Sequence, residues 1–234
     1  SSLWPLNNLA SFCPQALLHQ ALAAINTVVD ARSSRGKFQI PPSAQARPRP
    51  PTMPVMAQTF DVCIRGAGIV GRTLALLLAR ERLRVALVAP AQSRPQHKDV
   101  RAYALNISSR AVLQSLRCWP DDEDATPVTA MQVFGDLDGQ VQFDAASQEV
   151  EALAWIVDVP ALEQRLAEAV RYQPQVEIVK EPVAAALTAV CEGRASSTRA
   201  EFGVNFSVTP YPQHAIATRL QCELPHGGIA RQWF

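Results

Sequence analysis

The stretch Phe60-Asp-Val-Cys-Ile-Arg65 is followed directly by Gly66-Ala-Gly68-Ile-Val-Gly71 and then by Arg72-Thr-Leu-Ala-Leu-Leu-Leu-Ala-Arg80. The first part predicts a short buried strand, the second a tight glycine turn, and the third a helix made almost entirely of Leu and Ala. A second strand is expected over residues 84–89, at the spacing that a strand–helix–strand unit requires. This order predicts a parallel nucleotide-binding sheet.

The three glycines have separate roles in such a unit. Gly66 allows the turn, Gly68 lets the backbone approach a pyrophosphate, and Gly71 lets helix and strand pack closely. The pyrophosphate would lie at the helix N-terminus, where unpaired N–H groups and the positive end of the helix dipole face it. The alternative is a glycine turn that is merely structural. The predicted dinucleotide-binding residues here are Gly66, Ala67, Gly68, Ile69, Val70 and Gly71.

One part of the dinucleotide pattern is missing. A carboxylate about 20 residues beyond the glycines normally binds the ribose hydroxyls. The second predicted strand ends here in Ala89-Pro90, which carries no carboxylate. Ribose binding must therefore be weaker or come from elsewhere in the chain.

The composition and net charge of the chain argue against several classes of function. The chain has 234 residues, of which 48% are hydrophobic, so it can bury a core in one or two domains. A net charge of +1 gives no electrostatic case for a nucleic-acid partner or an anionic membrane surface. Cys63 and Cys191 lie in apolar runs, and the sequence has no C-x-x-C pair, which favours small buried thiols in a reducing compartment. The four histidines have no metal-ligand spacing, so no metal is expected.

Residues 1–55 differ in composition from the rest of the chain. A proline-dense tract occupies residues 41–54, and such a tract behaves as a disordered, extended linker. No basic segment precedes an apolar run, which argues against a secretory signal, and the apolar run is too short to span a bilayer. We expect that the native start is Met56 or Met53; a targeting or interaction tail is the alternative. N-terminal sequencing of the natural protein decides between them.

The remaining sequence predicts a mixture of helices and short strands. Asp138-Gly139 sits between two runs that alternate with period two, which is a strong hairpin signal. Pro160 opens a helix, and a serine is expected to cap another. Helices are predicted over 109–116 and from 160 onward, and strands over 131–134, 141–143, 153–157, 176–179, 187–191 and 215–222. This order predicts a parallel sheet interrupted by an antiparallel section.

Several landmarks in sequence order resemble the flavin-dependent aromatic hydroxylases. They are the glycine turn, Asp99-x-Arg101-x-x-x-Leu105, and Glu192-Gly193-Arg-Ala-Ser196-x-x-Arg199. The segments 211–217 and 225–234 are similar to the ubiquinone-biosynthesis branch of that family. The resemblance covers residues 58–234 and implies the fold of para-hydroxybenzoate hydroxylase: an α/β, Rossmann-like FAD-binding sheet with an antiparallel β substrate-domain portion, here truncated.

The resemblance assigns cofactor-binding roles to individual residues. Arg101 matches an arginine that reaches the phosphate or ribitol side of FAD, against the alternative of a surface ion pair with Asp99. Glu192 and Gly193 take the place of an Asp-Gly motif near FAD and the path of NAD(P)H, with a glutamate one methylene longer. His226 lies in a matching segment that we interpret as a structural turn. No catalytic residue is named, because the flavin carries the chemistry.

The resemblance also implies a division into domains and several departures from the family. Residues 56–125 and 160–203 would form the FAD-binding domain, and 126–159 and 204–234 a partial substrate domain. Ala89 replaces a glutamate, and Val159 stands near a position that often holds Arg or Gln. The stretch between the strands at 179 and 187 is short. The later Gly-Asp motif would lie beyond Phe234, which indicates a partial sequence.

The implied function is an FAD-dependent NAD(P)H monooxygenase that hydroxylates a phenolic or quinone precursor in ubiquinone biosynthesis, through a flavin hydroperoxide and O2. The expected location is the cytoplasm, with peripheral association at the inner membrane face and membership of a multi-enzyme quinone-biosynthesis complex as further expectations. Three alternatives stay open: a non-catalytic truncated fragment, a flavin oxidoreductase with another substrate, and a simple NAD(P)-binding module.

Overall fold

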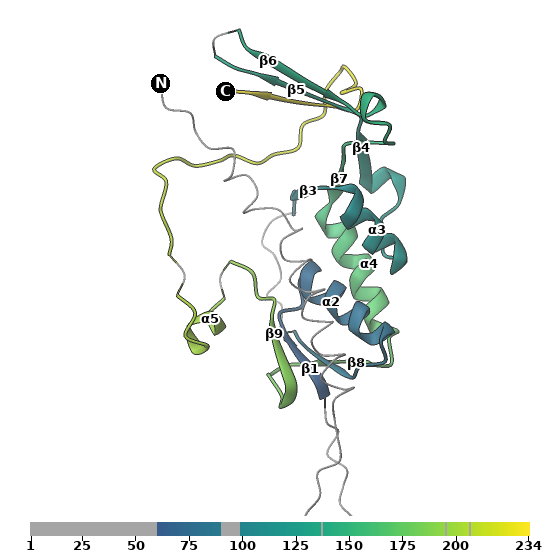
Figure 1. Cartoon of the computed structure of the whole chain (residues 1–234), viewed down its shortest axis with the longest axis vertical. Coiled ribbons are helices and arrows are strands. Elements are labelled where there is room, and N and C mark those ends of the chain that lie inside the picture. Colours follow the sequence, from purple (N-terminus) through teal and green to yellow (C-terminus); the bar gives the residue numbers. More distant parts are fainter. Residues whose placement is uncertain (1–59, 90–98, 137, 195, 206) are drawn as a thin grey trace, which may run out of the picture.

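In the part of the chain that the structure describes, three sheets follow one another along the long axis of the molecule (Figure 1). The computed structural model describes residues 60–89, 99–136, 138–194, 196–205 and 207–234. The predictions for residues 1–55, including the native start, lie outside the described residues. A parallel sheet with helices and separate antiparallel pairings confirms the predicted α/β fold class.

The parallel sheet contains four strands in the order β8-β2-β1-β9. They are β1 (Phe60–Arg65), β2 (Val85–Val88), β8 (Val176–Val179) and β9 (Ala185–Val190). The two strands predicted on either side of the glycine turn are therefore neighbours, and both are largely buried. Buried parallel strands read as continuous apolar runs, which is why this part of the sequence predicted its structure well.

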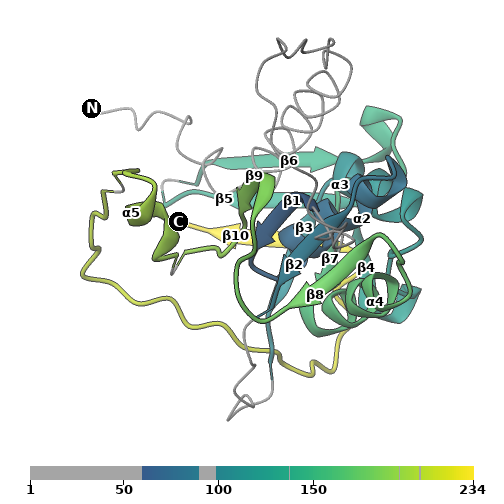
Figure 2. The same ribbon diagram turned by 90° about the horizontal axis from the view of Figure 1, so that it is seen from below.

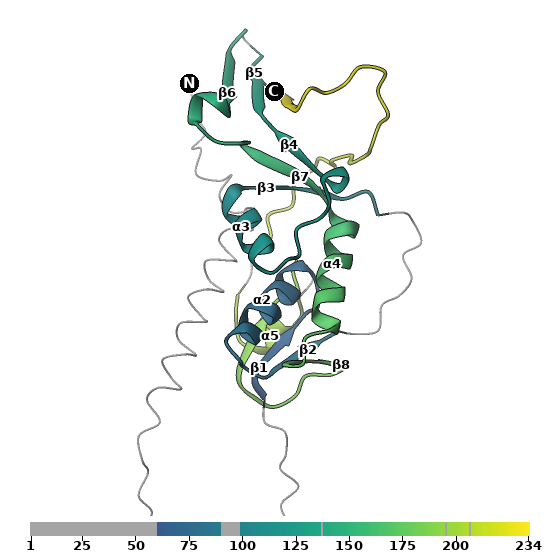
Figure 3. The ribbon, with the colours of Figure 1, turned by 90° about the vertical axis from the view of Figure 1, so that its right-hand side faces the viewer.

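Two helices, α2 (Ile69–Arg80) and α4 (Val159–Arg171), pack against one another beside this sheet (Figures 1 and 3). The helix predicted from Pro160 presents its apolar residues on one face, as expected from their spacing. Asp158 caps it, because its carboxylate accepts a hydrogen bond from the Ala161 N–H at 3.1 Å. The buried core shared by sheet and helices includes Val62, Ile64, Leu74, Leu78, Val85, Leu87, Leu162, Leu166 and Val170.

A second sheet has the order β3-β7-β4 and is antiparallel. It consists of β3 (Ala102–Leu105), β4 (Ala125–Val128) and β7 (Ala154–Asp158). The prediction had no strand at β3. The next helix, α3 (Ile107–Ser115), begins two residues earlier than predicted. Its cap is Asn106 and not a serine, because the Asn106 side chain accepts from the Ser109 N–H at 2.9 Å.

The third sheet has the order β10-β5-β6. The predicted hairpin around Asp138-Gly139 is confirmed as β5 (Ala130–Phe134) paired antiparallel with β6 (Gln140–Asp144). Strand β10 (Ile229–Trp233) pairs parallel with β5, and its Trp233 ring stacks on Phe134 with centroids 5.4 Å apart. Short helical turns complete the described elements: η2 (Asp122–Asp124), η3 (Ala146–Gln148) and α5 (Thr198–Glu201).

The predicted strand at 215–222 is wrong. Residues 207–228 form a long irregular segment on the outside of the molecule, which Figure 3 shows looping away from the sheets. A segment with alternating apolar residues forms a strand only where another strand pairs with it. Among the described residues, no strand pairs with this segment. The segment is instead attached through Arg219, which donates to the Val100 and Arg101 carbonyl oxygens and pairs with the Asp158 carboxylate.

The glycine turn between β1 and α2 is packed too closely for side chains at two of its positions. Gly66 has a φ of +111°, and a Cβ there would lie 2.5 Å from the Cys191 carbonyl oxygen. A Cβ at Gly71 would lie 1.9 Å from the Gly66 carbonyl oxygen. A Cβ at Gly68 would meet none of the described residues within 4 Å. In the view along the long axis, β9, β1, β2 and β8 follow one another across the parallel sheet (Figure 2).

Replacing Leu166 by Ala is expected to lower the free energy of unfolding by about 2–5 kcal/mol, because the fully buried side chain leaves a cavity between α4 and the sheet. Urea denaturation followed by circular dichroism measures the change. Leu220→Ala is the matched control: Leu220 is 79% exposed, so its loss should change stability by less than about 0.5 kcal/mol. Equal effects of the two substitutions would contradict the assigned core.

Replacing Gly71 by Ala is expected to destabilise the fold by about 1–3 kcal/mol, because the new methyl group overlaps the Gly66 carbonyl oxygen and backbone must move. Gly68→Ala is the control on the same turn, since its methyl group points into open space. Thermal unfolding of both variants beside the wild type makes the comparison. A Gly71→Ala variant as stable as Gly68→Ala would show that the turn is not packed as described.

Candidate functional site

Two loops meet at the carboxyl end of the parallel sheet. The first is the turn after β1, and the second begins at Cys191, just after β9. Because β1 and β9 are hydrogen-bonded neighbours, the two loops start side by side, and the Cys191 N–H donates to the Arg65 carbonyl oxygen at 2.7 Å. Ligands of parallel α/β sheets bind in this position, outside the carboxyl ends of the strands.

The first turn of α2 is open to a ligand. Gly68 is the N-cap residue, and none of the described side chains caps the helix. The first helical bond runs from the Arg72 N–H to the Gly68 carbonyl oxygen at 3.0 Å, so the preceding N–H groups have no partner within the helix. Gly68 is exposed, with open space where a side chain would point. Backbone N–H donors that can be approached this closely fit a phosphate group.

Glu192 lies at the centre of a hydrogen-bonded cluster in the second loop. Its carboxylate accepts hydrogen bonds from the Ser196 and Thr198 hydroxyl groups, both at 2.7 Å. Arg65 Nε lies 3.3 Å from the same carboxylate. Partial burial raises the pKa of Glu192, but these hydroxyl groups and the Arg65 charge outweigh it and hold the pKa below its ordinary value. Glu192 is therefore ionised near neutral pH.

Arg101 is held by acidic neighbours. Its guanidinium contacts both carboxylate oxygens of Asp99, at 2.6 to 3.0 Å, and lies 3.6 Å from the Glu163 carboxylate. The hydrogen bonds from Arg101 lower the pKa of Asp99 to about 2. Arg72, the residue after the glycine turn, donates to the Glu163 carbonyl oxygen at 3.2 Å. Glu163 thus lies between Arg101 and the start of α2, and the Asp99–Arg101 ion pair considered from the sequence is present.

The other residues singled out from the sequence fall into two places. Gly193 has a φ of +73° and open space around it, as a turn after Glu192 requires. His226 lies away from this loop, just before β10, where its Nδ1 accepts from the Gly228 N–H at 3.0 Å, consistent with a structural turn. Two site residues were missed by sequence reasoning: Arg65 and Thr198. A charged residue ending an apolar strand was the available signal for the first.

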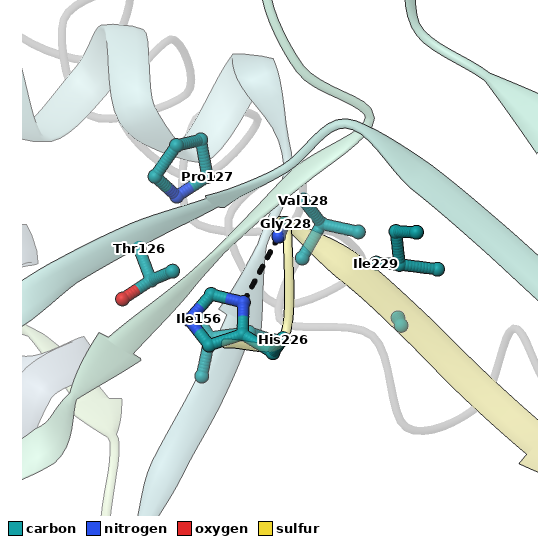
Figure 4. A pocket seen from close by; sticks show the side chains of 8 residues that line it. Thr126, Pro127, Val128, Ile156, His226, Gly228 and Ile229 are labelled. Carbon is teal, nitrogen blue, oxygen red and sulfur yellow. Dashed lines mark hydrogen bonds between the residues drawn. The ribbon is translucent and has the colours of Figure 1, made fainter. Parts of the chain in front are cut away.

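His226 also borders a small hollow at the other end of the molecule. Figure 4 shows the hollow between β4, β7 and β10. At the edge of the hollow, the His226 ring accepts a hydrogen bond from the Gly228 N–H. Its volume is about 240 Å³, and most of its lining is apolar. The lining residues are Thr126, Pro127, Val128, Ile156, His226, Gly228, Ile229 and Ala230.

Three further observations on the described residues concern a cysteine, metal binding and membrane crossing. Burial raises the pKa of the Cys191 thiol to about 11, so this cysteine is a protonated packing residue at neutral pH. Within the described ranges, no group of three or more His, Cys, Asp or Glu residues is arranged to hold a metal ion. No helix in the part of the chain that the structure covers is long and apolar enough to cross a membrane.

The sequence is similar to curated proteins, although no protein-family model matches it. It is 26% identical over 204 residues to 3-demethoxyubiquinol 3-hydroxylase of Escherichia coli, which covers 76% of this chain and 52% of that protein. It is 23% identical over 201 residues to an uncharacterized protein of Synechocystis, covering 75% of this chain and 49% of the relative. The chain thus spans about half the length of the curated relatives it matches.

The fold is similar to solved monooxygenase structures. A p-nitrophenol 4-monooxygenase from Pseudomonas putida superposes with a TM-score of 0.51 at 18% identity, over 64% of this chain and 45% of the other. A probable FAD-dependent monooxygenase from Pseudomonas aeruginosa gives 0.53 at 19% identity, over 66% of this chain and 48% of the other. These comparisons confirm the resemblance predicted from the ordered motifs: the chain is similar to FAD-dependent hydroxylases of the ubiquinone branch.

Proposed function

We propose that this chain provides the FAD-binding part of an FAD-dependent monooxygenase that hydroxylates a phenolic or quinone precursor in ubiquinone biosynthesis. The observation that carries the proposal is the open first turn of α2, with the Glu192 loop beside it at the same end of the parallel sheet. The similarity to 3-demethoxyubiquinol 3-hydroxylase supports the substrate class.

In this proposal the glycine turn holds the pyrophosphate of FAD. The N–H groups of Ile69 and Val70 donate to phosphate oxygens, since they lie in the uncapped first turn of α2. Gly68 allows the approach because it has no side chain in the open space beside it. Gly66 and Gly71 contribute indirectly, by letting the turn pack against β9 and α2.

Arg101 and Glu192 provide the charged groups around the cofactor. Arg101 binds the phosphate or ribitol side of FAD, which requires it to share its donors with Asp99 or leave that carboxylate. Glu192 and Gly193 contact FAD from the loop after β9, near the path of NAD(P)H. Oxygen activation and hydroxyl transfer are supplied by the flavin when it is bound, and the protein orients the cofactor and excludes water.

The domain assignment belongs to the same proposal. Residues 56–125 and 160–203 form the FAD-binding domain, and 126–159 and 204–234 part of a substrate domain. The sheet β3-β7-β4 joins the two, because β3 comes from the first range, whereas β7 and most of β4 come from the second. NAD(P)H and O2 are the proposed co-substrates, with a prenylated phenol as the proposed substrate. Peripheral membrane association and membership of a quinone-biosynthesis complex would be consistent with such a substrate.

The test is an absorption spectrum of the purified chain after incubation with FAD and desalting. We expect flavin bands at a stoichiometry near one, and an FAD affinity at least about tenfold weaker for Gly68→Ala, because its methyl group occupies the space through which the phosphate approaches. Thermal unfolding of Gly68→Ala without cofactor should match the wild type, which separates lost binding from lost fold.

Three results would contradict the proposal. A colourless wild-type protein after desalting favours the alternative of a non-catalytic fragment. An unchanged FAD affinity in Gly68→Ala would remove the cofactor from this turn. If the wild type binds NADPH tightly and FAD weakly, a simple NAD(P)-binding module accounts for the chain better.

A further inference from the structure

Arg65 is an unusual residue for its place in the fold. It ends β1 directly before the glycine turn, and the three residues before it are fully buried and apolar. Only 18% of the Arg65 side chain is exposed. Its Nε atom is buried and, among the described residues, no acceptor is aligned to take a hydrogen bond from it, although a Glu192 oxygen lies 3.3 Å away. Burying a cation in such a position costs free energy unless the cation is paired with an anion and hydrogen-bonded.

The contacts of Arg65 connect the two loops of the candidate site. Its backbone carbonyl accepts from Cys191, and its guanidinium pairs with Glu192 on one side and with Glu201 on the other, the latter at 2.7 Å. Glu201 lies 136 residues further along the chain, in α5. Arg65 therefore connects the end of β1 both to the loop after β9 and to the last residue of α5.

The charge of Glu192 explains why such a contact matters. The carboxylate is anchored by Ser196 and Thr198 in its ionised form, at the end of the sheet where the uncapped turn of α2 also lies. A negative charge there opposes the binding of any phosphate group. A guanidinium beside the carboxylate cancels that repulsion while keeping the side chain in place.

We propose that Arg65 is a positioning residue of the dinucleotide site, which fixes the Glu192 carboxylate beside the glycine turn and neutralises it there. The inference rests on the proposed function for the identity of the ligand. Its structural half, the fixing of Glu192, stands independently of which ligand binds. Arg65 itself need not contact the cofactor.

A surface ion pair would have similar contacts but behave differently. Exposed pairs contribute little, because solvent screens them and the side chains lose entropy when they are held together. Arg65 and Glu192 are both mostly buried, with side-chain exposures of 18% and 24%. Besides the contact with Arg65, the Glu192 carboxylate accepts hydrogen bonds from the Ser196 and Thr198 hydroxyl groups. The pair is thus part of a fixed network.

The experiment uses the full chain and four substitutions: Arg65→Gln, Arg65→Lys, Glu192→Gln and the double variant Arg65→Gln/Glu192→Gln. FAD affinity is measured by quenching of flavin fluorescence. We expect about a tenfold loss for Arg65→Gln, near wild-type affinity for Arg65→Lys, and recovery of most of the loss in the double variant, because position 192 beside the glycine turn then carries no charge. Arg80→Gln is the matched control, because it removes the same charge at the far end of α2.

A second measurement is independent of the cofactor. Carbon-13 NMR of glutamate-labelled protein, with Glu192→Gln to assign the signal, gives the pKa of Glu192. That pKa should rise in Arg65→Gln and stay low in Arg65→Lys, because only the first substitution removes the neighbouring positive charge. Thermal unfolding identifies any variant that fails to fold. If Arg65→Gln fails to fold, Arg65→Met, which also removes the charge but keeps an unbranched side chain, takes its place in both measurements.

The outcomes separate the two proposals. If the wild type binds no FAD, the proposed function fails, and the pKa of Glu192 alone decides whether Arg65 fixes and neutralises that carboxylate. If the wild type binds FAD but Arg65→Gln loses no more affinity than Arg80→Gln, the inference is overturned. A pKa of Glu192 that does not respond to Arg65→Gln overturns it as well.

Discussion

The Cys191 carbonyl oxygen occupies the space that a side chain at Gly66 would need, and the candidate site depends on this contact. A Cβ at Gly66 would lie 2.5 Å from that oxygen, and the φ of +111° is one that glycine adopts without strain. The turn after β1 can therefore lie directly against the end of β9. This closeness brings together two loops that are more than a hundred residues apart in sequence. The Arg65 carbonyl and side chain contact the second loop at the same place.

The hydrophobic packing of α2 against α4 determines the orientation of α2, and with it the orientation of the glycine turn at its start. Leu74 and Leu78 of α2 are buried with Leu162 and Leu166 in one core, which fixes the axis of α2 relative to the sheet. Once that axis is fixed, the uncapped N–H groups of its first turn lie at the carboxyl end of the strands. The same packing places Glu163 of α4 between Arg72 and Arg101, so a polar chain runs beside the turn. The packing of apolar side chains in the core thus determines where the charged side chains lie.

Local patterns made the buried parallel unit, the hairpin and the glycine turn predictable from the sequence. Strand β3 was missed because it is mostly exposed and is a strand only because β7 pairs with it, whereas the strand wrongly predicted at 215–222 has no such partner among the described strands. In the site, the turn and the Glu192-Gly193 pair could be named from spacing and resemblance, although their ligand contacts stay predictions. Arg65 could not be given a partner, because both of its carboxylates lie more than a hundred positions further along the chain. Pairing between distant segments is the information that a single sequence lacks.

The missing carboxylate at Ala89 changes how a dinucleotide would be held. A carboxylate at the end of β2 usually binds the ribose hydroxyls, and each such charge-assisted hydrogen bond contributes about 1.5–3 kcal/mol. In the proposed site Ala89 makes no such bond, so unless another part of the chain binds the ribose, the phosphate end of a bound dinucleotide would supply a larger share of the binding energy. Any repulsion near the phosphates then matters more than it would in a site with the ribose carboxylate. An arginine that neutralises Glu192 beside the turn offsets that repulsion where the remaining binding energy is concentrated.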